Sequence, residues 1–363
     1  MVVCLHASNN LRNELYLGHA ADFVSRLFSF GDAGVPFFFV LSGFIVTRVH
    51  LPDFDHPARV KGYLLKRAAR IYPVYWLVFA LSYAAASMLP HTRVVLPHDA
   101  LTLIKSLLLL PQVPTAPGDT GAPVVFVAWT LQHEMAFYAV MALALVRRWL
   151  LCLPVALYVL NRQWHAFGDG MLQHFFSNDL VILLAMGAGL AMLTRTRRPM
   201  RHARALCLCA ALAFMALAVW DMQTFGGPRA HWRVLAYGLV SAATIWGLVR
   251  MEDGGWALSP DHLLVRLGNA SYALYLIHIP VLSPLGKLVT AVFTQTGAHH
   301  TALATPLILA ATLLMVAACC VVAWWFHRRV EQPITRSLTR RIAQWTTTGK
   351  PVVKAGMALA TAQ

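Results

Sequence analysis

The sequence predicts an all-α membrane protein, a polytopic bundle of about ten transmembrane helices of which the first is cut short. Of its 363 residues, 58% are hydrophobic and only 12% are charged, and the mean hydropathy is +0.59. A soluble globular domain carries roughly 25% charged residues, about twice this share. The hydrophobic residues gather in long runs, and the basic residues gather between them. Composition and pattern together exclude a soluble globule.

Nine apolar runs are candidates for the transmembrane helices. A span needs about 20 apolar residues, so the run that begins at Trp149 is short and should extend into its flanks. With the stub Met1–His6, ten spans are expected. The nine runs are Leu27–Thr47, Ile71–Leu89, Val124–Val146, Trp149–Leu160, Phe175–Leu193, Ala205–Trp220, Val234–Val249, Ala270–Phe293 and Ala302–Phe326.

The two ends of the sequence differ from the rest. The stub Met1–His6 is too short to span a bilayer or to serve as a signal peptide. Either the sequence starts inside the first helix, or the chain lacks half of that helix, and we favour the first interpretation. Residues 1–342 are expected to form the membrane domain. Residues 343–363 lack an apolar period and are expected to form a disordered cytoplasmic tail.

The basic residues predict the orientation of the chain. With the N-terminus inside, 22 of the 30 Lys and Arg residues fall in five cytoplasmic segments, as the positive-inside rule requires, and the C-terminus is cytoplasmic. The net charge of +15 therefore reflects topology and contact with anionic lipid. Nucleic-acid binding is disfavoured because the charge is spread over separate loops. The five segments are Arg48–Arg70, Arg147–Arg148, Arg195–Arg204, Arg250–Arg266 and the tail after Arg328.

Two sequence blocks stand near the cytoplasmic end of the predicted bundle. The aromatic run Gly34–Phe44 closes on Ser42 and Gly43, small residues that let a neighbouring helix approach closely. The second block contains Arg67, Arg70 and Tyr72, and its two arginines share a helix face on which they can clamp a phosphate. The alternative, simple anchoring by positive charge, explains the charge and leaves the spacing to chance. From the sequence alone that alternative is favoured.

The block from Trp129 to Tyr138 carries the sharpest signal. Glu134 lies ten residues into its apolar run, about 15 Å from the outer end, which places it near the bilayer midplane. Thr130, Glu134 and Tyr138 recur at four-residue spacing and line one helix face. Ionisable groups inside hydrocarbon mark chemistry or a solute path, so Glu134 and His6 are predicted to be functional. A structural hydrogen bond is the alternative for Glu134.

These blocks together resemble the acyltransferase 3 family of integral membrane acyltransferases, which modify surface polysaccharides and related glycans. The similarity runs from His6 to Pro333 and includes Ser271–His278 as well as Glu331-Gln332-Pro333. The chain departs from the family pattern at two places. The arginine that usually stands eleven positions before the first-helix histidine would fall before Met1, and Pro36 stands where an aspartate is common.

The resemblance implies an enzyme of the bacterial inner membrane that moves an acyl group, acetyl by family analogy, from cytoplasmic acyl-CoA to a glycan hydroxyl or a lipid-linked sugar. Acyl-CoA would be a co-substrate, and no permanently bound cofactor is expected. Its phosphates would lie near Arg67 and Arg70, with Tyr72 in the same block. His6 would be the general base, with Glu134 orienting or charging it. A relay between the two is a further possibility. The remaining candidates are Ser42, Trp129, Tyr138 and His278.

Other interpretations remain at this stage. A transporter or flippase of a lipid-linked glycan would use Glu134 and His6 as a proton relay, but the matched hydropathy halves typical of such proteins are not evident. A catalytically inactive partner in polysaccharide assembly is the third. His278 is equally well explained as a membrane histidine satisfied by a neighbouring helix. No metal site is predicted, because the pairs Cys207/Cys209 and Cys319/Cys320 lack zinc-site partners. The sequence does not define the acceptor or the oligomeric state.

Overall fold

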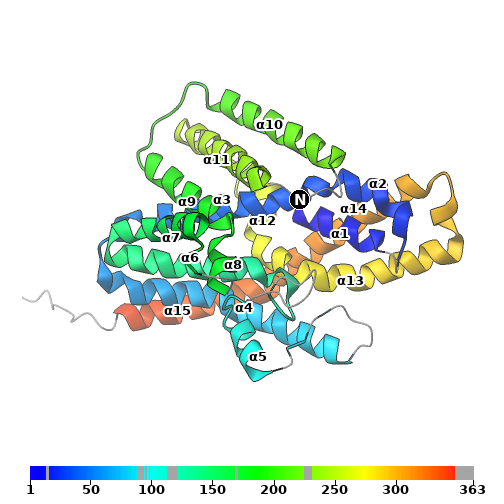
Figure 1. Ribbon diagram of the computed structural model, residues 1–363, viewed down its shortest axis with the longest axis horizontal. Coiled ribbons are helices and arrows are strands. Elements are labelled where there is room, and N and C mark those ends of the chain that lie inside the picture. The colour runs from blue at the N-terminus through cyan, green and yellow to red at the C-terminus, as the bar shows by residue number, and fades with distance from the viewer. Residues whose placement is uncertain are drawn as a thin grey trace, which may run out of the picture.

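The predicted helical class is confirmed. The computed structural model describes residues 1–13, 16–88, 94, 96–97, 99–112, 121–167, 171–224 and 231–347, and these residues form helices with no strand among them (Figure 1). All nine apolar runs are helical over most of their length. The α-helices are α1 Val2–Arg12, α2 Asp22–Leu27, α3 Gly34–His50, α4 Val60–Met88, α5 Ala100–Leu107, α6 Trp129–Val146, α7 Leu153–Trp164, α8 Met171–Phe176, α9 Leu180–Leu193, α10 Ala203–Gln223, α11 His231–Asp253, α12 Leu263–Asn269, α13 Ser271–Thr296, α14 Ala304–Phe326 and α15 Gln332–Thr347.

Short tight turns of helix connect several of these elements. Seven are 3₁₀ helices, and a single π-helical turn joins α14 to α15 within the described chain. Helix α15 extends to Thr347, five residues into the predicted tail, and the rest of that tail lies outside the described residues. The connecting turns are η1 Gly18–Ala21, η2 Ser29–Ala33, η3 Leu51–Asp53, η4 Pro57–Arg59, η5 Phe126–Ala128, η6 Arg148–Cys152, η7 Ala298–His300 and the π turn η8 His327–Glu331.

Six helical segments in the described part of the chain are long and apolar enough to cross a membrane. Helix α9 is apolar but shorter. The polytopic membrane architecture is therefore confirmed, while the crossing of the shorter helices α1, α6, α7 and α9, and with it the total of ten, stays a prediction. The six segments are Ser29–Asp53, Pro57–Met88, Ala203–Gln223, Trp232–Asp253, Ser271–Thr296 and Ala304–Trp345.

Two helix boundaries differ from those expected from the apolar runs. Helix α6 starts at Trp129 and not near Val124, because Pro123 and the positive φ of Val124 (69°) interrupt the helical backbone. Glu134 is consequently the sixth residue of its helix. The run Phe175–Leu193 is divided into α8 and α9, and between them the Asn178 side chain accepts a hydrogen bond from the N–H of Leu180, the first residue of α9 (3.1 Å).

Helices α3 and α9 cross in close contact, as the small residues after the aromatic run predict. A Cβ on Gly43 would lie 2.2 Å from the Leu184 carbonyl oxygen, and one on Gly187 would lie 2.0 Å from the Val40 carbonyl oxygen. No side chain fits at either position, so the two backbones touch directly. Because Ser42 precedes Gly43, this crossing also fixes the position of the Ser42 hydroxyl.

We expect Gly187→Ala to destabilise the protein by about 1–3 kcal/mol, because the added methyl group must push α3 and α9 apart. Gly189→Ala is the matched control on the same helix, since a Cβ there meets nothing within 4 Å. That control should be neutral or slightly stabilising. Thermal unfolding of the protein in detergent measures both variants, and equal melting temperatures for the two would contradict the close crossing.

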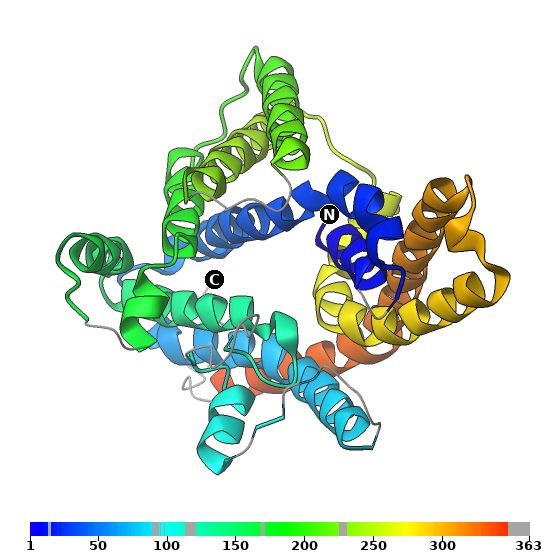
Figure 2. The same ribbon diagram turned by 45° about the vertical axis from the view of Figure 1, so that its right-hand side comes forward.

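The hydrophobic core has two parts. The larger part joins α3, α4, α6, α9 and α13. The smaller one packs α1 against α13 and α14, with Ala7 and Leu11 contributed by α1. In Figure 2 the hairpin of α10 and α11, drawn in green at the top, stands apart from the yellow and orange hairpin of α13 and α14. Helix α1 lies against that second hairpin, so Ser8 is buried and His6 half-buried within the bundle.

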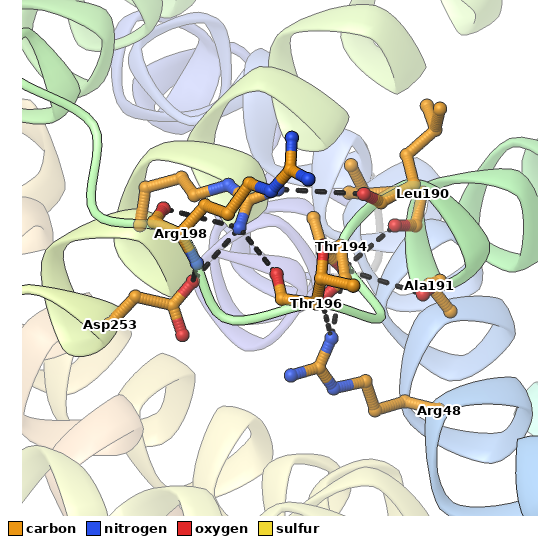
Figure 3. A network of polar contacts seen from close by, with 9 residues as sticks. Arg48, Leu190, Ala191, Thr194, Thr196, Arg198 and Asp253 are labelled. Atoms are coloured by element: carbon orange, nitrogen blue, oxygen red, sulfur yellow. Dashed lines mark hydrogen bonds and ion pairs between the residues drawn. The ribbon is translucent and has the colours of Figure 1, made fainter.

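The predicted cytoplasmic segments lie at one end of the bundle. Arg48 at the end of α3 donates to the carbonyl oxygen and hydroxyl of Thr194, and the backbone N–H of Arg198 donates to Asp253 (3.2 Å), as Figure 3 shows. The Arg148 N–H donates to Asp55 (2.8 Å), and this contact holds the pKa of that carboxyl below its usual value. These contacts place four of the five segments at the same end of the bundle, while the side of the membrane on which this end lies stays a prediction.

Candidate functional site

The N-terminal helix supplies a half-buried histidine that meets a second histidine from α13. His6 Nδ1 lies 2.8 Å from His278 Nε2, and the two rings are nearly parallel at 9° with centroids 5.1 Å apart. His278 is fully buried, and its Nδ1 lies 3.0 Å from the Leu274 carbonyl oxygen one turn earlier. The ring of Phe126 approaches His6 edge-on at 6.3 Å. Two candidates 272 residues apart are thus brought together.

A second polar cluster surrounds Glu134 on α6. Its Oε1 accepts hydrogen bonds from the Ser42 hydroxyl of α3 (3.2 Å) and from the Tyr138 hydroxyl one turn further along α6. All three side chains are buried. The four-residue spacing of Glu134 and Tyr138 and the close crossing of α3 explain why these groups meet. Three further candidates therefore form one hydrogen-bonded unit.

The two clusters are separate, and in the described part of the chain no hydrogen bond joins Glu134 to His6, so an orienting or charging effect of Glu134 on His6 stays a prediction. The hydrogen-bond partner of His6 is His278, whereas Glu134 is bonded to Ser42 and Tyr138. Between them lies Tyr275, whose hydroxyl bonds the Thr130 hydroxyl and the Val127 carbonyl oxygen, with its ring 6.1 Å from that of His278. Thr130 is one helical turn before Glu134. The residue spacing within α6 does not predict the contact of Thr130 with Tyr275 of α13.

Arg67 connects the Glu134 cluster to the end of the bundle. Its guanidinium lies over the rings of Tyr138 (5.2 Å) and Tyr63 (5.5 Å), and its Nη2 donates to His50 Nε2 (3.1 Å). The basic end of α4 therefore contacts the same tyrosine that donates to Glu134. An arginine on aromatic faces is a preorganised group for binding an anion.

Arg70 shares the α4 face with Arg67 but has a different neighbour. It is half exposed, and its Nη1 lies 4.0 Å from the buried Glu331 carboxylate, which His327 also contacts at 2.8 Å. Tyr72 points elsewhere because five residues turn the helix by about 140°. Its hydroxyl donates to the Leu108 carbonyl oxygen (2.9 Å), so the structure does not bring Tyr72 together with the arginines.

Trp129 lies at the start of α6, apart from Glu134. It lines a small pocket, and its ring meets that of His133 edge-on at 6.1 Å. Aromatic, amide and imidazole groups share this pocket. The lining residues are Pro111, Gln112, Trp129, Gln132, His133, Met171, Phe175 and Asn178. In the described part of the chain no group of three His, Cys, Asp or Glu side chains could hold a metal ion.

Sequence reasoning singled out neither Tyr275 nor His50 as a site residue. Tyr275 stands three residues before His278, so both side chains lie on one face of α13. This spacing could have identified Tyr275 from the sequence. His50 stands three residues before Asp53, whose carboxylate its Nδ1 contacts at 2.9 Å. The contact of His50 with Arg67 joins α3 to α4, and no sequence pattern within either helix predicts it.

These observations define a helical membrane protein with a histidine pair and a carboxylate cluster inside the bundle and arginines at one end. The family model described as "Acyltransferase domain" matches residues 1–325, and the chain belongs to this acyltransferase 3 family. The exopolysaccharide production protein ExoZ of Rhizobium meliloti (strain 1021) is 31% identical over 301 residues, covering 80% of this chain and 88% of ExoZ. No solved structure gives a significant match.

Proposed function

We propose that the protein transfers an acyl group, acetyl in the first instance, from acyl-CoA to a hydroxyl of a glycan or lipid-linked sugar during exopolysaccharide production. The observation that carries the proposal is the hydrogen-bonded pair of His6 and His278 in a chain of an acyltransferase family. The name of ExoZ supports the link to exopolysaccharide. The membrane would be the bacterial inner membrane, with the arginine end and the C-terminus in the cytoplasm.

The donor would bind at the arginine end. Arg67 and Arg70 would contact the phosphates of CoA, since guanidinium groups recognise phosphate through paired hydrogen bonds. The Tyr138 and Glu134 unit lies next along the path from Arg67 into the bundle. Acyl-CoA would be a co-substrate that arrives and leaves with each turnover.

His6 would act on the acceptor as general base. The hydroxyl proton passes to the imidazole, the oxygen attacks the thioester carbonyl carbon, and the carbon–sulfur bond breaks. The CoA sulfur leaves as a thiolate and takes the proton back from the imidazolium. Histidine suits this exchange because its ordinary pKa lies near neutral pH. Glu134 would contribute negative charge within the bundle and not a direct contact with His6.

We expect Arg67→Ala to weaken acyl-CoA binding by about 10- to 100-fold, because a hydrogen bond to a charged group is worth roughly 1.5–3 kcal/mol. Titration of acetyl-CoA into the purified protein in nanodiscs measures binding. Release of free CoA thiol in the presence of glycan measures turnover. Arg147→Ala is the matched control, an exposed arginine at the same end of the bundle. Equal binding by both variants would place the donor elsewhere. No binding by the unmodified protein would favour the transporter alternative.

A further inference from the structure

The hydrogen bonds of the histidine pair determine which ring nitrogens carry hydrogen. The Leu274 carbonyl oxygen can only accept, so the His278 Nδ1 at 3.0 Å must be the donor. A buried histidine avoids the charged form, and a neutral imidazole carries one hydrogen. His278 Nε2 therefore holds a lone pair and accepts from His6 Nδ1 at 2.8 Å. His6 in turn carries its hydrogen on Nδ1, which leaves the lone pair on Nε2.

We infer that His278 is the positioning residue of the reaction: it holds His6 in the Nδ1–H tautomer, so that Nε2 is the atom that takes the proton from the acceptor hydroxyl. This inference rests on the proposed function and deepens it. The chain of contacts runs from the Leu274 carbonyl through both imidazoles to the reacting nitrogen. Its anchor is a backbone carbonyl group of helix α13.

The arrangement serves both halves of the proton exchange. Before transfer, an acceptor on the Nδ1 side keeps hydrogen off Nε2, because each neutral ring has one hydrogen to place. After transfer, the His6 imidazolium still donates through Nδ1 to His278, now as a charge-assisted hydrogen bond, which is stronger than a neutral one. The near-parallel rings keep Nε2 of His6 facing away from its partner. Without His278, hydrogen is free to occupy Nε2 and block the base.

Three substitutions of His278 separate this role from packing. Gln places its carbonyl oxygen where Nε2 stands and can accept from His6. Asn is too short to do so, and Phe fills the space with no acceptor. We expect the kcat for transfer from acetyl-CoA to fall about 100-fold or more for His278→Phe and His278→Asn, with KM for acetyl-CoA unchanged. His278→Gln should retain activity within about tenfold of the unmodified protein.

The tautomer itself is measured by ¹⁵N NMR of histidine-labelled protein in nanodiscs, with the His6 signals identified by their loss in His6→Ala. We expect the Nδ1–H form in the unmodified protein and in His278→Gln, and a mixture or the Nε2–H form in His278→Phe. His299→Phe is the matched control, since its Nδ1 also lies 3.0 Å from a carbonyl oxygen, that of Phe293, but far from His6.

The spectrum and the kcat of the His278 variants test the positioning role of His278, and transfer to glycan tests the proposed function. An Nε2–H tautomer of His6 in the unmodified protein overturns the inference, whatever the activity, and so does full kcat in His278→Phe. If His278→Phe fails to fold, the Gln variant and the unmodified spectrum still decide. If the unmodified protein binds acetyl-CoA but transfers no acyl group to glycan, the proposed function fails while the spectrum continues to test the tautomer separately.

Discussion

His6→Asn is expected to lower the kcat of acyl transfer by about 10²–10⁴-fold, the usual contribution of a general base. The substitution is chosen because the Asn amide nitrogen occupies the place of Nδ1. It can still donate to His278, so the contact between α1 and α13 persists. What disappears is the nitrogen that accepts the proton. Acetyl-CoA binding and the melting temperature should therefore stay close to those of the unmodified protein.

The control for this variant is His19→Asn. His19 is fully exposed and contacts Asp22 at 3.0 Å, so its loss should leave activity unchanged. The measurement is the rate of label transfer from acetyl-CoA to glycan at saturating donor. A His6→Asn protein that is folded, binds donor and retains more than a tenth of the activity would remove His6 from the mechanism.

Arg233→Met is expected to destabilise the protein by about 3–5 kcal/mol, because it leaves two buried or half-buried carboxylates without their cation. Arg233 makes paired hydrogen bonds to Asp221 (2.5 and 2.6 Å) and to Asp32 (3.0 and 2.6 Å). Tyr237 also donates to Asp221 at 2.7 Å. This network ties the hairpin of α10 and α11 to η2, the turn that leads into α3. Its loss should lower the yield of folded protein and the melting temperature.

Arg12→Met is the matched comparison. Arg12 pairs with Asp22 at 2.6 Å, but both side chains are more than a third exposed, and exposed ion pairs contribute only about 0–1 kcal/mol. Restoring charge balance provides a second check: Asp32→Asn combined with Arg233→Met should recover part of the loss. A melting temperature for Arg233→Met equal to that for Arg12→Met would show that the network does not hold the hairpin.

The fold followed from local patterns in the sequence. Apolar runs became helices, and the small residues at Ser42 and Gly43 predicted a close crossing that α9 provides. Spacing placed Glu134 and Tyr138 on one face. These predictions succeeded because helix periodicity and the size of side chains act over a few residues.

The sequence did not predict the contacts between distant parts of the chain, the direction of one side chain or the start of one helix. The partner of His6 is 272 positions away, and nothing in the composition of either helix indicates it. Tyr72 shares a sequence block with Arg67 yet faces α5, because residues adjacent in sequence point in different directions around a helix. The start of α6 was placed too early because apolar residues in a turn resemble apolar residues in a helix.

The two polar clusters divide the proposed reaction between two parts of the bundle. In the proposed reaction Arg67, Tyr138 and Glu134 would form the donor side, and His278 and His6 would form the acceptor side, with Tyr275 and Thr130 between them. Transfer would then require both sides, and a variant on either side should fail in a different step. Donor-side variants lose acetyl-CoA binding or thioester placement. Acceptor-side variants retain binding and lose proton transfer.

The most direct test is the acetyl content of surface glycan in a host from which the gene has been deleted, supplied with labelled acetyl-CoA precursor and complemented with this chain, with Glu134→Gln or with His6→Asn. The account predicts label on the glycan with the unmodified chain and none above background with either variant, at equal protein levels in the membrane. Unlabelled glycan with the unmodified chain, together with altered glycan export, would contradict the acyltransferase account and favour a transporter.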